Sequence, residues 1–114
     1  MRILIVEDEA LSAMLLERQL KSAGHETLKP VATGEDAVRV ACAEKPAMVL
    51  MDIRLAGEMD GIEAARQILS RVSCKLVFTS GYQENDIYER AMALKPSGYI
   101  LKPIFLDALL EYLS

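Results

Sequence analysis

Short runs of apolar residues alternate along the chain with longer stretches in which apolar residues recur every three or four positions. The first pattern predicts buried strands, and the second predicts helices that turn one apolar face inward. Predicted strands cover residues 2–6, 26–31, 47–51, 75–79 and 98–102, and a helical stretch follows each of them. The last stretch, a helix of about ten residues, carries Leu106, Leu109, Leu110 and Leu113. This strict alternation predicts a parallel sheet with helices on both faces and right-handed connections.

Glycine and proline residues mark the boundaries of these elements. Gly24 ends the first helical stretch, Pro46 ends the second, and Pro96 follows the fourth. Pro30 lies within the weak second strand, and proline lacks the N–H group that a central strand donates, so this strand is predicted at a sheet edge. No repeat, linker or low-complexity tract interrupts the pattern, which predicts one domain over residues 1–114.

The composition narrows the class of protein. Hydrophobic residues make up 52% of the 114 residues and charged residues 26%, which is typical of a globular domain. The net charge of -4 supplies no basic face, so we expect no nucleic-acid binding by this domain. No apolar run approaches membrane-spanning length and no signal-like segment opens the chain, so neither a membrane span nor secretion is expected. Cys42 and Cys74 lack metal or redox spacing, which favours a reducing, cytoplasmic location, although a disulfide between them stays open.

Charged and hydroxyl side chains stand where the predicted strands end. Glu7 and Asp8 follow the first strand, Asp52 the third, Thr79 ends the fourth, and Lys102 ends the fifth. Ligands of open α/β sheets bind beyond the carboxyl ends of the strands, at the point where the strand order reverses. The sequence therefore predicts one site that brings three carboxylates, a hydroxyl and an ammonium together.

Electrostatics restricts what such a site can be. Two carboxylates about 4 Å apart repel each other by roughly 4 kcal/mol at an effective dielectric constant near 20. They need a cation, a proton or a lysine to offset that repulsion, and a hard oxygen site of this kind suits Mg²⁺. No glycine-rich loop follows the first strand, which excludes a P-loop and a dinucleotide fingerprint.

Each of these residues also has an ordinary structural interpretation when it is taken alone. Glu7 and Asp8 fit the first turn of a helix, where acids complement the helix dipole. Asp52 and Thr79 fit turns, and Lys102 fits a solvated surface. Their placement at successive strand ends of one alternating pattern favours the shared site.

These residues and their neighbours resemble the receiver domain of bacterial response regulators over essentially the whole chain. The resemblance implies a flavodoxin-like (βα)5 fold, a doubly wound parallel sheet with strand order 2-1-3-4-5. That order would place Asp8 near Asp52 and make the second strand an edge. The segments that carry it are residues 3–9 (ILIVEDE), 49–53 (VLMDI), 59–61 (MDG), 77–80 (VFTS) and 98–103 (GYILKP).

The resemblance also implies an acceptor and a metal site. Asp52 takes the position of the phosphoacceptor. Asp8, helped by Glu7, takes the position of the Mg²⁺ ligands, and Asp52 with the backbone carbonyl of Arg54 completes them. Many members of the family have an aspartate where this chain has Glu7, which is one methylene longer but still an oxygen ligand.

Three further positions match the switch of the family. Thr79 matches the hydroxyl that bonds a phosphoryl oxygen, and Lys102 matches the cation that pairs with Asp52 and then with the phosphoryl group. Tyr99 matches the aromatic switch residue, and the bond from Lys102 to Pro103 is expected to be cis. For Tyr99, an amphipathic ring at the edge of a strand is the alternative.

Two departures from the family pattern lie beside the site. The loop over residues 54–61 is one residue longer than usual and lacks the common proline, so the fit to a kinase or the rate of dephosphorylation is expected to differ. Tyr82 opens the region of the fourth helix, where it either shares the switch role of Tyr99 or is a ring at a helix edge.

The resemblance implies a phosphorylation-dependent signalling switch that is not an enzyme acting on a separate substrate. A histidine kinase or a histidine phosphotransfer protein would be the donor. A downstream protein would bind the face formed by the fourth helix, the fifth strand and the fifth helix. A stand-alone receiver and a part of a larger regulator or hybrid kinase both stay open.

Three other functions compete with this prediction. A receiver that only binds partners would not need the acceptor, hydroxyl and lysine together. An aspartyl phosphatase of the haloacid dehalogenase type needs a second acid two residues after its nucleophile, where this chain has Arg54. A flavodoxin needs a hydroxyl-rich phosphate loop after the first strand, which is missing here.

Overall fold

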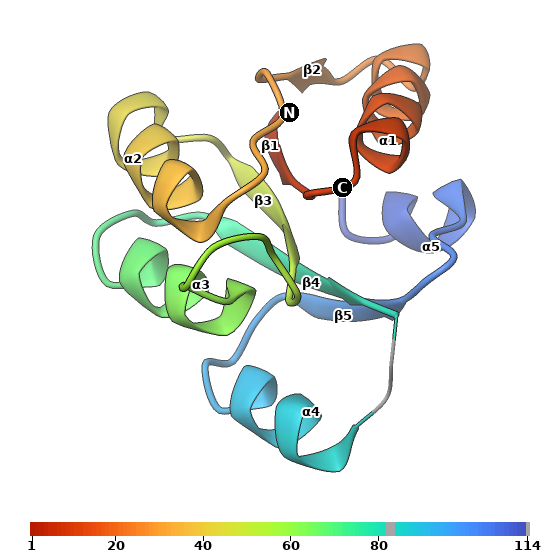
Figure 1. The fold of residues 1–114 in the computed structure, drawn as a ribbon. Helices are drawn as coiled ribbons and strands as arrows, with labels where there is room; N and C mark the ends of the chain where they lie inside the picture. The colour runs from red at the N-terminus through yellow and green to blue at the C-terminus, as the bar shows by residue number, and fades with distance from the viewer. Residues whose placement is uncertain (82–83, 114) are drawn as a thin grey trace.

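The computed structural model describes residues 1–81 and 84–113. Strands and helices alternate through them, as the hydrophobic pattern predicts (Figure 1). The strands are β1 (Arg2–Val6), β2 (Glu26–Thr27), β3 (Met48–Asp52), β4 (Lys75–Ser80) and β5 (Gly98–Leu101). The helices are α1 (Ala10–Ser22), α2 (Gly34–Glu44), α3 (Gly61–Leu69), α4 (Asn85–Met92) and α5 (Leu106–Leu110).

The strands form one parallel sheet in the order β2-β1-β3-β4-β5, which confirms the predicted topology. Helices α1 and α5 cover one face, and α2, α3 and α4 cover the other (Figure 1). The order reverses between β1 and β3, whose carboxyl ends therefore lie next to each other. This reversal is where an open α/β sheet binds its ligands.

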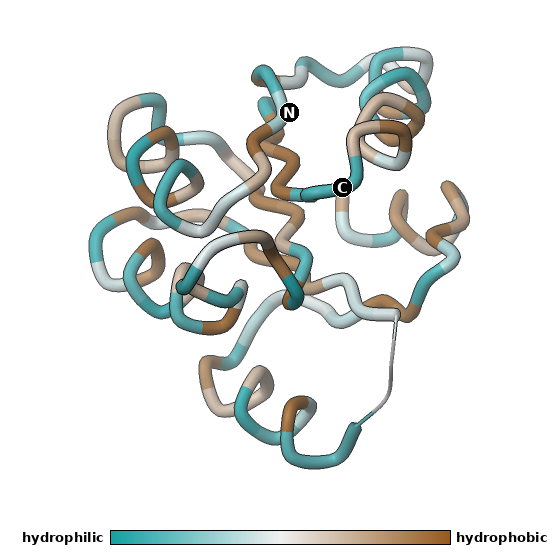
Figure 2. Tube along the Cα trace, in the orientation of Figure 1, coloured by the Kyte–Doolittle hydropathy of each residue, from teal (hydrophilic) through white to brown (hydrophobic). Residues whose placement is uncertain are grey.

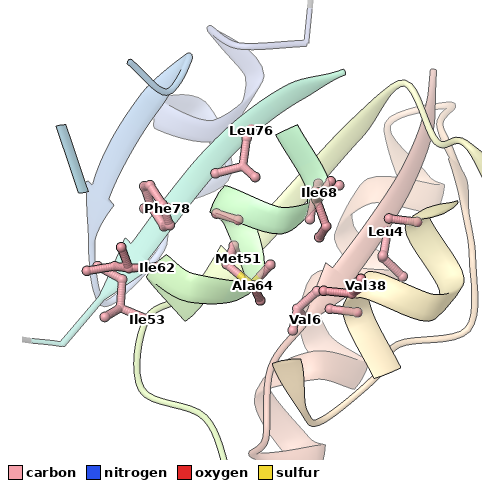
Figure 3. Packing of buried hydrophobic residues seen from close by; sticks show 14 of the residues in the cluster. Leu4, Val6, Val38, Met51, Ile53, Ile62, Ala64, Ile68, Leu76 and Phe78 are labelled. Carbon is pink, nitrogen blue, oxygen red and sulfur yellow. The ribbon is translucent and has the colours of Figure 1, made fainter. Parts of the chain in front are cut away.

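The central strands are buried on both faces, which explains their continuous apolar sequences. In β1, Ile3 and Ile5 pack toward α1 and α5, whereas Leu4 and Val6 pack toward α2 and α3. Figure 2 shows the hydrophobic residues concentrated in the strands, between the two helical layers. Figure 3 shows the larger cluster, in which Phe78 of β4 and side chains of β1, β3 and α3 meet.

A glycine lets α3 begin directly against the end of β3. Asp60 caps the helix, because its carboxylate accepts a hydrogen bond from the backbone N–H of Glu63 at 2.8 Å. Gly61 follows, and a Cβ atom there would lie 2.0 Å from the backbone oxygen of Asp52. The close approach of helix and strand therefore requires glycine.

Two elements are much shorter than the sequence predicts, and β5 ends one residue earlier, at Leu101. Strand β2 covers Glu26–Thr27 alone, and the predicted strand over residues 26–31 is otherwise represented by an isolated bridge between Val31 and Val6. Pro30 offers no N–H to a ladder, and β2 is the edge strand that this proline predicts. Helix α5 has five residues rather than about ten.

The chain after α5 still packs as a continuation of it. The N–H groups of Tyr112 and Leu113 bond to carbonyls three residues earlier, at 3.0 and 3.1 Å, which is the tighter spacing of a 3₁₀ turn. Leu113 is buried beside Leu109. The helical spacing of these leucines thus located the buried face correctly but overestimated the α-helix.

Cys42 and Cys74 are both free within the described chain, so the disulfide left open by the sequence is absent from the structure. None of the helices in the described residues is both long and apolar enough to cross a membrane.

Candidate functional site

The carboxyl ends of four strands bring the predicted site residues to one edge of the sheet. Asp52 is the last residue of β3, and Thr79 lies beside it in the register of β4. Glu7 and Asp8 directly follow β1, and Lys102 directly follows β5.

Backbone hydrogen bonds across the strands hold this edge in place. The N–H of Ile53 donates to the carbonyl of Thr79 at 3.1 Å, and the N–H of Lys102 donates to the carbonyl of Ser80 at 2.8 Å. The N–H of Glu7 donates to the carbonyl of Val31 at 2.9 Å. The side chains of the site thus start from backbone positions that the sheet itself fixes.

Lys102 connects the ends of three strands through its ammonium group. Its Nζ lies 3.0 Å from Oδ2 of Asp52 and 3.2 Å from each carboxylate oxygen of Glu7. The side chains of Glu7 and Asp52 are 5% and 6% exposed, so these ion pairs are shielded from solvent, while that of Lys102 is 32% exposed. The sequence predicted the contact with Asp52, whereas the contact with Glu7 is a finding of the structure.

Glu7, Asp8 and Asp52 form a compact cluster of carboxylates. Each offers one oxygen, and these three oxygens all lie within 4.8 Å of one another. Asp8 is exposed, so the cluster opens to solvent on one side. A solvent-facing group of three acidic oxygens fits the ligand chemistry of Mg²⁺, which binds through a few carboxylates and keeps several waters.

The crowding of carboxylates changes how Glu7 holds its proton. The pKa of Glu7 is raised to about 8. Burial is the largest cause, and the hydrogen bond that the protonated Glu7 shares with Asp52 and the negative charge of Asp52 act in the same direction, while Lys102 opposes the shift. Burial by itself would lower the pKa of Lys102, but its contacts with Asp52 and Glu7 outweigh that effect and raise it. The one ammonium therefore compensates only part of the negative charge.

The backbone just after β3 forms a hydrogen bond with the side chain of Asp52. The N–H of Arg54 donates to Oδ1 of Asp52 at 3.3 Å, while Lys102 contacts Oδ2. The two oxygens of Asp52 thus have different partners. The predicted role of the Arg54 carbonyl as a metal ligand stays a prediction.

Comparison with known proteins assigns the chain to a protein family. Residues 3–114 match the family described as the response regulator receiver domain. The chain belongs to this family. The resemblance predicted from the strand-end residues is therefore confirmed, and the chain is a signalling domain of the two-component type.

Individual relatives agree with this assignment. Over 109 residues the receiver is 35% identical to the transcriptional regulatory protein PdtaR of Mycobacterium tuberculosis, covering 96% of this chain and 53% of that protein. It is 31% identical to protein PilH of Pseudomonas aeruginosa, covering 99% of this chain and 94% of PilH. This receiver therefore spans about half the length of PdtaR but nearly all of PilH.

A solved structure shows the same fold. The signal receiver domain of a modulated diguanylate cyclase from Desulfovibrio desulfuricans G20 superposes with a TM-score of 0.92 and is 36% identical. The match covers 98% of this chain and 89% of that one. The flavodoxin-like arrangement is thus shared along essentially the whole receiver.

Tyr99 and Thr79 lie on neighbouring strands of the receiver. Thr79 is 3% exposed and lies beside Asp52 in the neighbouring strand. The ring of Tyr99 packs edge-on against Tyr88 of α4 at 5.0 Å between centroids and against Phe78 at 6.5 Å. Within the described residues, the Tyr99 hydroxyl is buried and has no hydrogen-bond partner. Tyr82, the alternative switch residue, lies outside the described residues.

Two side chains near the site were not predicted from the sequence. Tyr88 packs on Tyr99, and Glu84 accepts a hydrogen bond from the guanidinium of Arg54 at 2.7 Å. This ion pair links the loop after β3 to the residue that precedes α4. Each contact joins residues from different segments of the chain, and no local sequence pattern indicates that these residues are partners. The cis bond between Lys102 and Pro103 was predicted and is confirmed.

Proposed function

We propose that this receiver is a phosphorylation-dependent switch in which Asp52 accepts a phosphoryl group from a histidine kinase or a histidine phosphotransfer protein. The observation that carries the proposal is the buried Asp52 carboxylate with the Lys102 ammonium 3.0 Å from one oxygen. A lysine in this position orients the nucleophile and offsets the charge that arrives with the phosphoryl group. The geometry of this site supports the proposed transfer to Asp52, whereas the identity of the donor is inferred from the family.

The chemistry asks for positioning and charge compensation. An Asp52 oxygen forms a bond to phosphorus as the bond from phosphorus to the donor's imidazole nitrogen breaks, and its electron pair returns to that nitrogen. The product is an acyl phosphate on Asp52. Charge spreads over three equatorial oxygens in the transition state, so groups that bind those oxygens provide most of the catalysis. Lys102 and the Thr79 hydroxyl are the groups of this chain that we assign to them.

Glu7, Asp8, Asp52 and the backbone carbonyl of Arg54 would hold Mg²⁺. When bound, the ion would neutralise carboxylate charge and bind a phosphoryl oxygen. The cluster of three acidic oxygens within 4.8 Å supports this assignment. With one lysine among three carboxylates, the metal-free site keeps an excess of negative charge that would repel an anionic phosphoryl donor.

Switching would follow from movement of Thr79 toward the phosphoryl group, which changes the space available to Tyr99. A phosphoryl group can only shift an equilibrium by its different interaction with the two states. The Tyr99 hydroxyl has no partner among the described residues, which supports such a two-state residue because the inward position leaves a polar group unsatisfied there. The contact with Tyr88 would carry the change to α4.

We assign the output to the face formed by α4, β5 and α5, where a downstream protein would bind. Apolar side chains on this face reach solvent, including Tyr88 at 39%, Met92 at 38% and Leu101 at 43% exposure. The net charge of -4 gives no support to nucleic-acid binding by this domain, and a cytoplasmic location stays a prediction. The domain would assist its own phosphorylation and dephosphorylation without acting on a separate substrate.

Intact-protein mass tests the proposal after incubation with acetyl phosphate, with and without Mg²⁺. We expect wild type to gain one phosphoryl group in the presence of Mg²⁺ and to lose this gain on chelation, while Asp52→Asn gains none. No gain in either protein would favour a receiver that acts by binding alone. A gain in both would place the acceptor elsewhere.

A further inference from the structure

A cavity of about 440 Å³ lies on the α1 and α5 side of the sheet, next to the candidate site. Ile5 of β1 and Leu50 of β3 line it from the sheet, Leu16 lines it from α1, and Ile104 lines it from the segment before α5. Cavities that bind small molecules commonly measure about 300–1,000 Å³ and have mainly apolar walls. The size and the walls both fit a small ligand.

Exposed apolar side chains lie at and near the cavity. Leu15 of α1 lines it and is 57% exposed, and Leu11, one turn earlier, is 72% exposed. Phe105, which follows the lining residue Ile104, is 68% exposed. Apolar surface at Leu15 therefore faces solvent at the edge of the cavity, and a ligand with an apolar body would cover part of it.

One end of the cavity belongs to the candidate site. Glu7, Thr79 and Lys102 line this end, and the carboxylates of Asp8 and Asp52 lie within 4.8 Å of that of Glu7. The Lys102 ammonium already contacts both Glu7 and Asp52, at 3.0–3.2 Å. Even while Glu7 holds its proton, the two carboxylates of Asp8 and Asp52 outnumber the one ammonium, so this end keeps a net negative charge that attracts a positive head group and repels a negative one.

We propose that the cavity binds a small amphiphilic cation. Its apolar body would lie against Ile5, Leu16 and Leu50, and its ammonium would face Glu7. Thr79 and Lys102 line the same cavity. A bound ligand would restrict these two side chains, so binding would slow phosphorylation of Asp52. This slowing rests on the proposed function, whereas the binding itself does not.

Three probes of equal chain length separate the apolar from the charged contribution: octylammonium, octanol and octanoate. Each is titrated into the full chain in chelator at neutral pH, and binding is followed through the backbone amide signals of Ile5, Leu16 and Ile104. We expect saturable shifts with octylammonium and a Kd at least fivefold lower than for the other two probes. Tighter binding of octanoate, equal binding of all three, or no shifts would each overturn the proposal.

Adjacent residues of α1 provide matched variants. Gln19 lines the cavity, whereas Arg18 is exposed and does not line it, so Gln19→Phe fills the cavity edge and Arg18→Phe adds the same ring elsewhere. We expect Gln19→Phe to weaken octylammonium binding at least tenfold and Arg18→Phe to leave it within twofold. Full affinity in Gln19→Phe, or equal loss in both, would place binding on another surface. Ser12→Leu, at another lining position, repeats the test if Gln19→Phe does not fold.

The coupling is measured separately from the binding. Saturating octylammonium should slow phosphorylation by acetyl phosphate at least twofold in wild type and leave the rate of Gln19→Phe unchanged. Binding without any slowing would overturn the coupling. A chain that is never phosphorylated, even without the probe, would contradict the proposed function, while the titration alone would still decide whether the cavity binds cations.

Discussion

Glu7 holds its proton more tightly in the folded chain than in an unfolded one, because burial and the Asp52 carboxylate both oppose its negative charge. Its pKa rises from 4.5 to about 8. Between these values the folded chain keeps a proton that the unfolded chain releases, so the contribution of Glu7 to folding stability is fully present below pH 4.5 and is lost as the pH rises toward 8.

The first prediction concerns this pH dependence in the metal-free protein. From pH 5 to pH 8, we expect the free energy of unfolding to fall by up to about 4 kcal/mol. The lowered pKa of Glu63 and the raised pKa values of Cys74 and Lys102 act outside this window. Urea unfolding at several pH values in chelator measures the slope, and Glu7→Gln should flatten it. An equal slope in both proteins would contradict the assignment to Glu7.

The second prediction concerns the hydroxyl of Tyr99, which is buried without a hydrogen-bond partner among the described residues. Tyr99→Phe removes an unsatisfied group and keeps the ring packed against Tyr88, so we expect unfolding to cost about 1 kcal/mol more than in wild type. Tyr88→Phe is the matched control, with little change expected because Tyr88 is 39% exposed. Destabilisation of Tyr99→Phe in urea unfolding would show that the hydroxyl has a partner.

At the scale of elements, the site depends on how closely α3 can start behind β3. The third prediction is that Gly61→Ala destabilises the fold by about 3 kcal/mol, because the new Cβ would lie 2.0 Å from the backbone oxygen of Asp52. Phosphorylation of Asp52 should fall with it, as the strand end is displaced. Gly81→Ala is the control, since no described residue other than its chain neighbour lies within 4 Å of its new Cβ. Equal melting temperatures for the two variants would contradict the account.

The alternation of apolar strands and helical stretches predicted the element order and the sheet topology. It succeeded because strands buried on both faces need continuous apolar sequence, and because parallel neighbours need a crossover helix. The same pattern did not predict the lengths of β2 and α5 correctly. Pro30 limits the pairing of β2 with its one neighbour, and the leucine spacing of α5 continues through a 3₁₀ turn that an apolar period cannot distinguish from an α-helix.

The candidate site was predictable to a similar degree. Strand ends of a parallel sheet share an edge, so Asp52, Thr79 and Lys102 had to converge. The shared contact of Lys102 with Glu7, and the packing of Tyr88 on Tyr99, depend on side-chain reach between distant segments. No local pattern records such contacts, which is why the structure was needed to find them.

At the scale of the whole molecule, we expect the excess charge of the acidic cluster to couple folding to the binding of a cation. The fourth prediction is that Mg²⁺ raises the melting temperature, because it binds the folded cluster and not the separated acids of the unfolded chain. Free Mg²⁺ at tenfold its Kd would add about 1.4 kcal/mol of stability, or several degrees. Differential scanning fluorimetry across a Mg²⁺ series measures this increment.

Two carboxylate variants make that measurement specific. Asp8→Asn should reduce the Mg²⁺ increment, because Asp8 belongs to the cluster, and it should stabilise the metal-free protein by relieving repulsion. Asp107→Asn, an exposed acid of α5 outside the cluster, should keep the full increment. An increment that is absent from wild type, or unchanged in Asp8→Asn, would contradict the metal site.

Reduction of the phosphorylated chain with borohydride tests the central claim most directly. Borohydride converts an aspartyl phosphate to homoserine and leaves free aspartate unchanged, so peptide mapping after acetyl phosphate treatment identifies the acceptor. We predict homoserine at position 52 and at no other aspartate, dependent on both the phosphodonor and Mg²⁺. Homoserine at position 8 or 60, or none at all, would contradict the account.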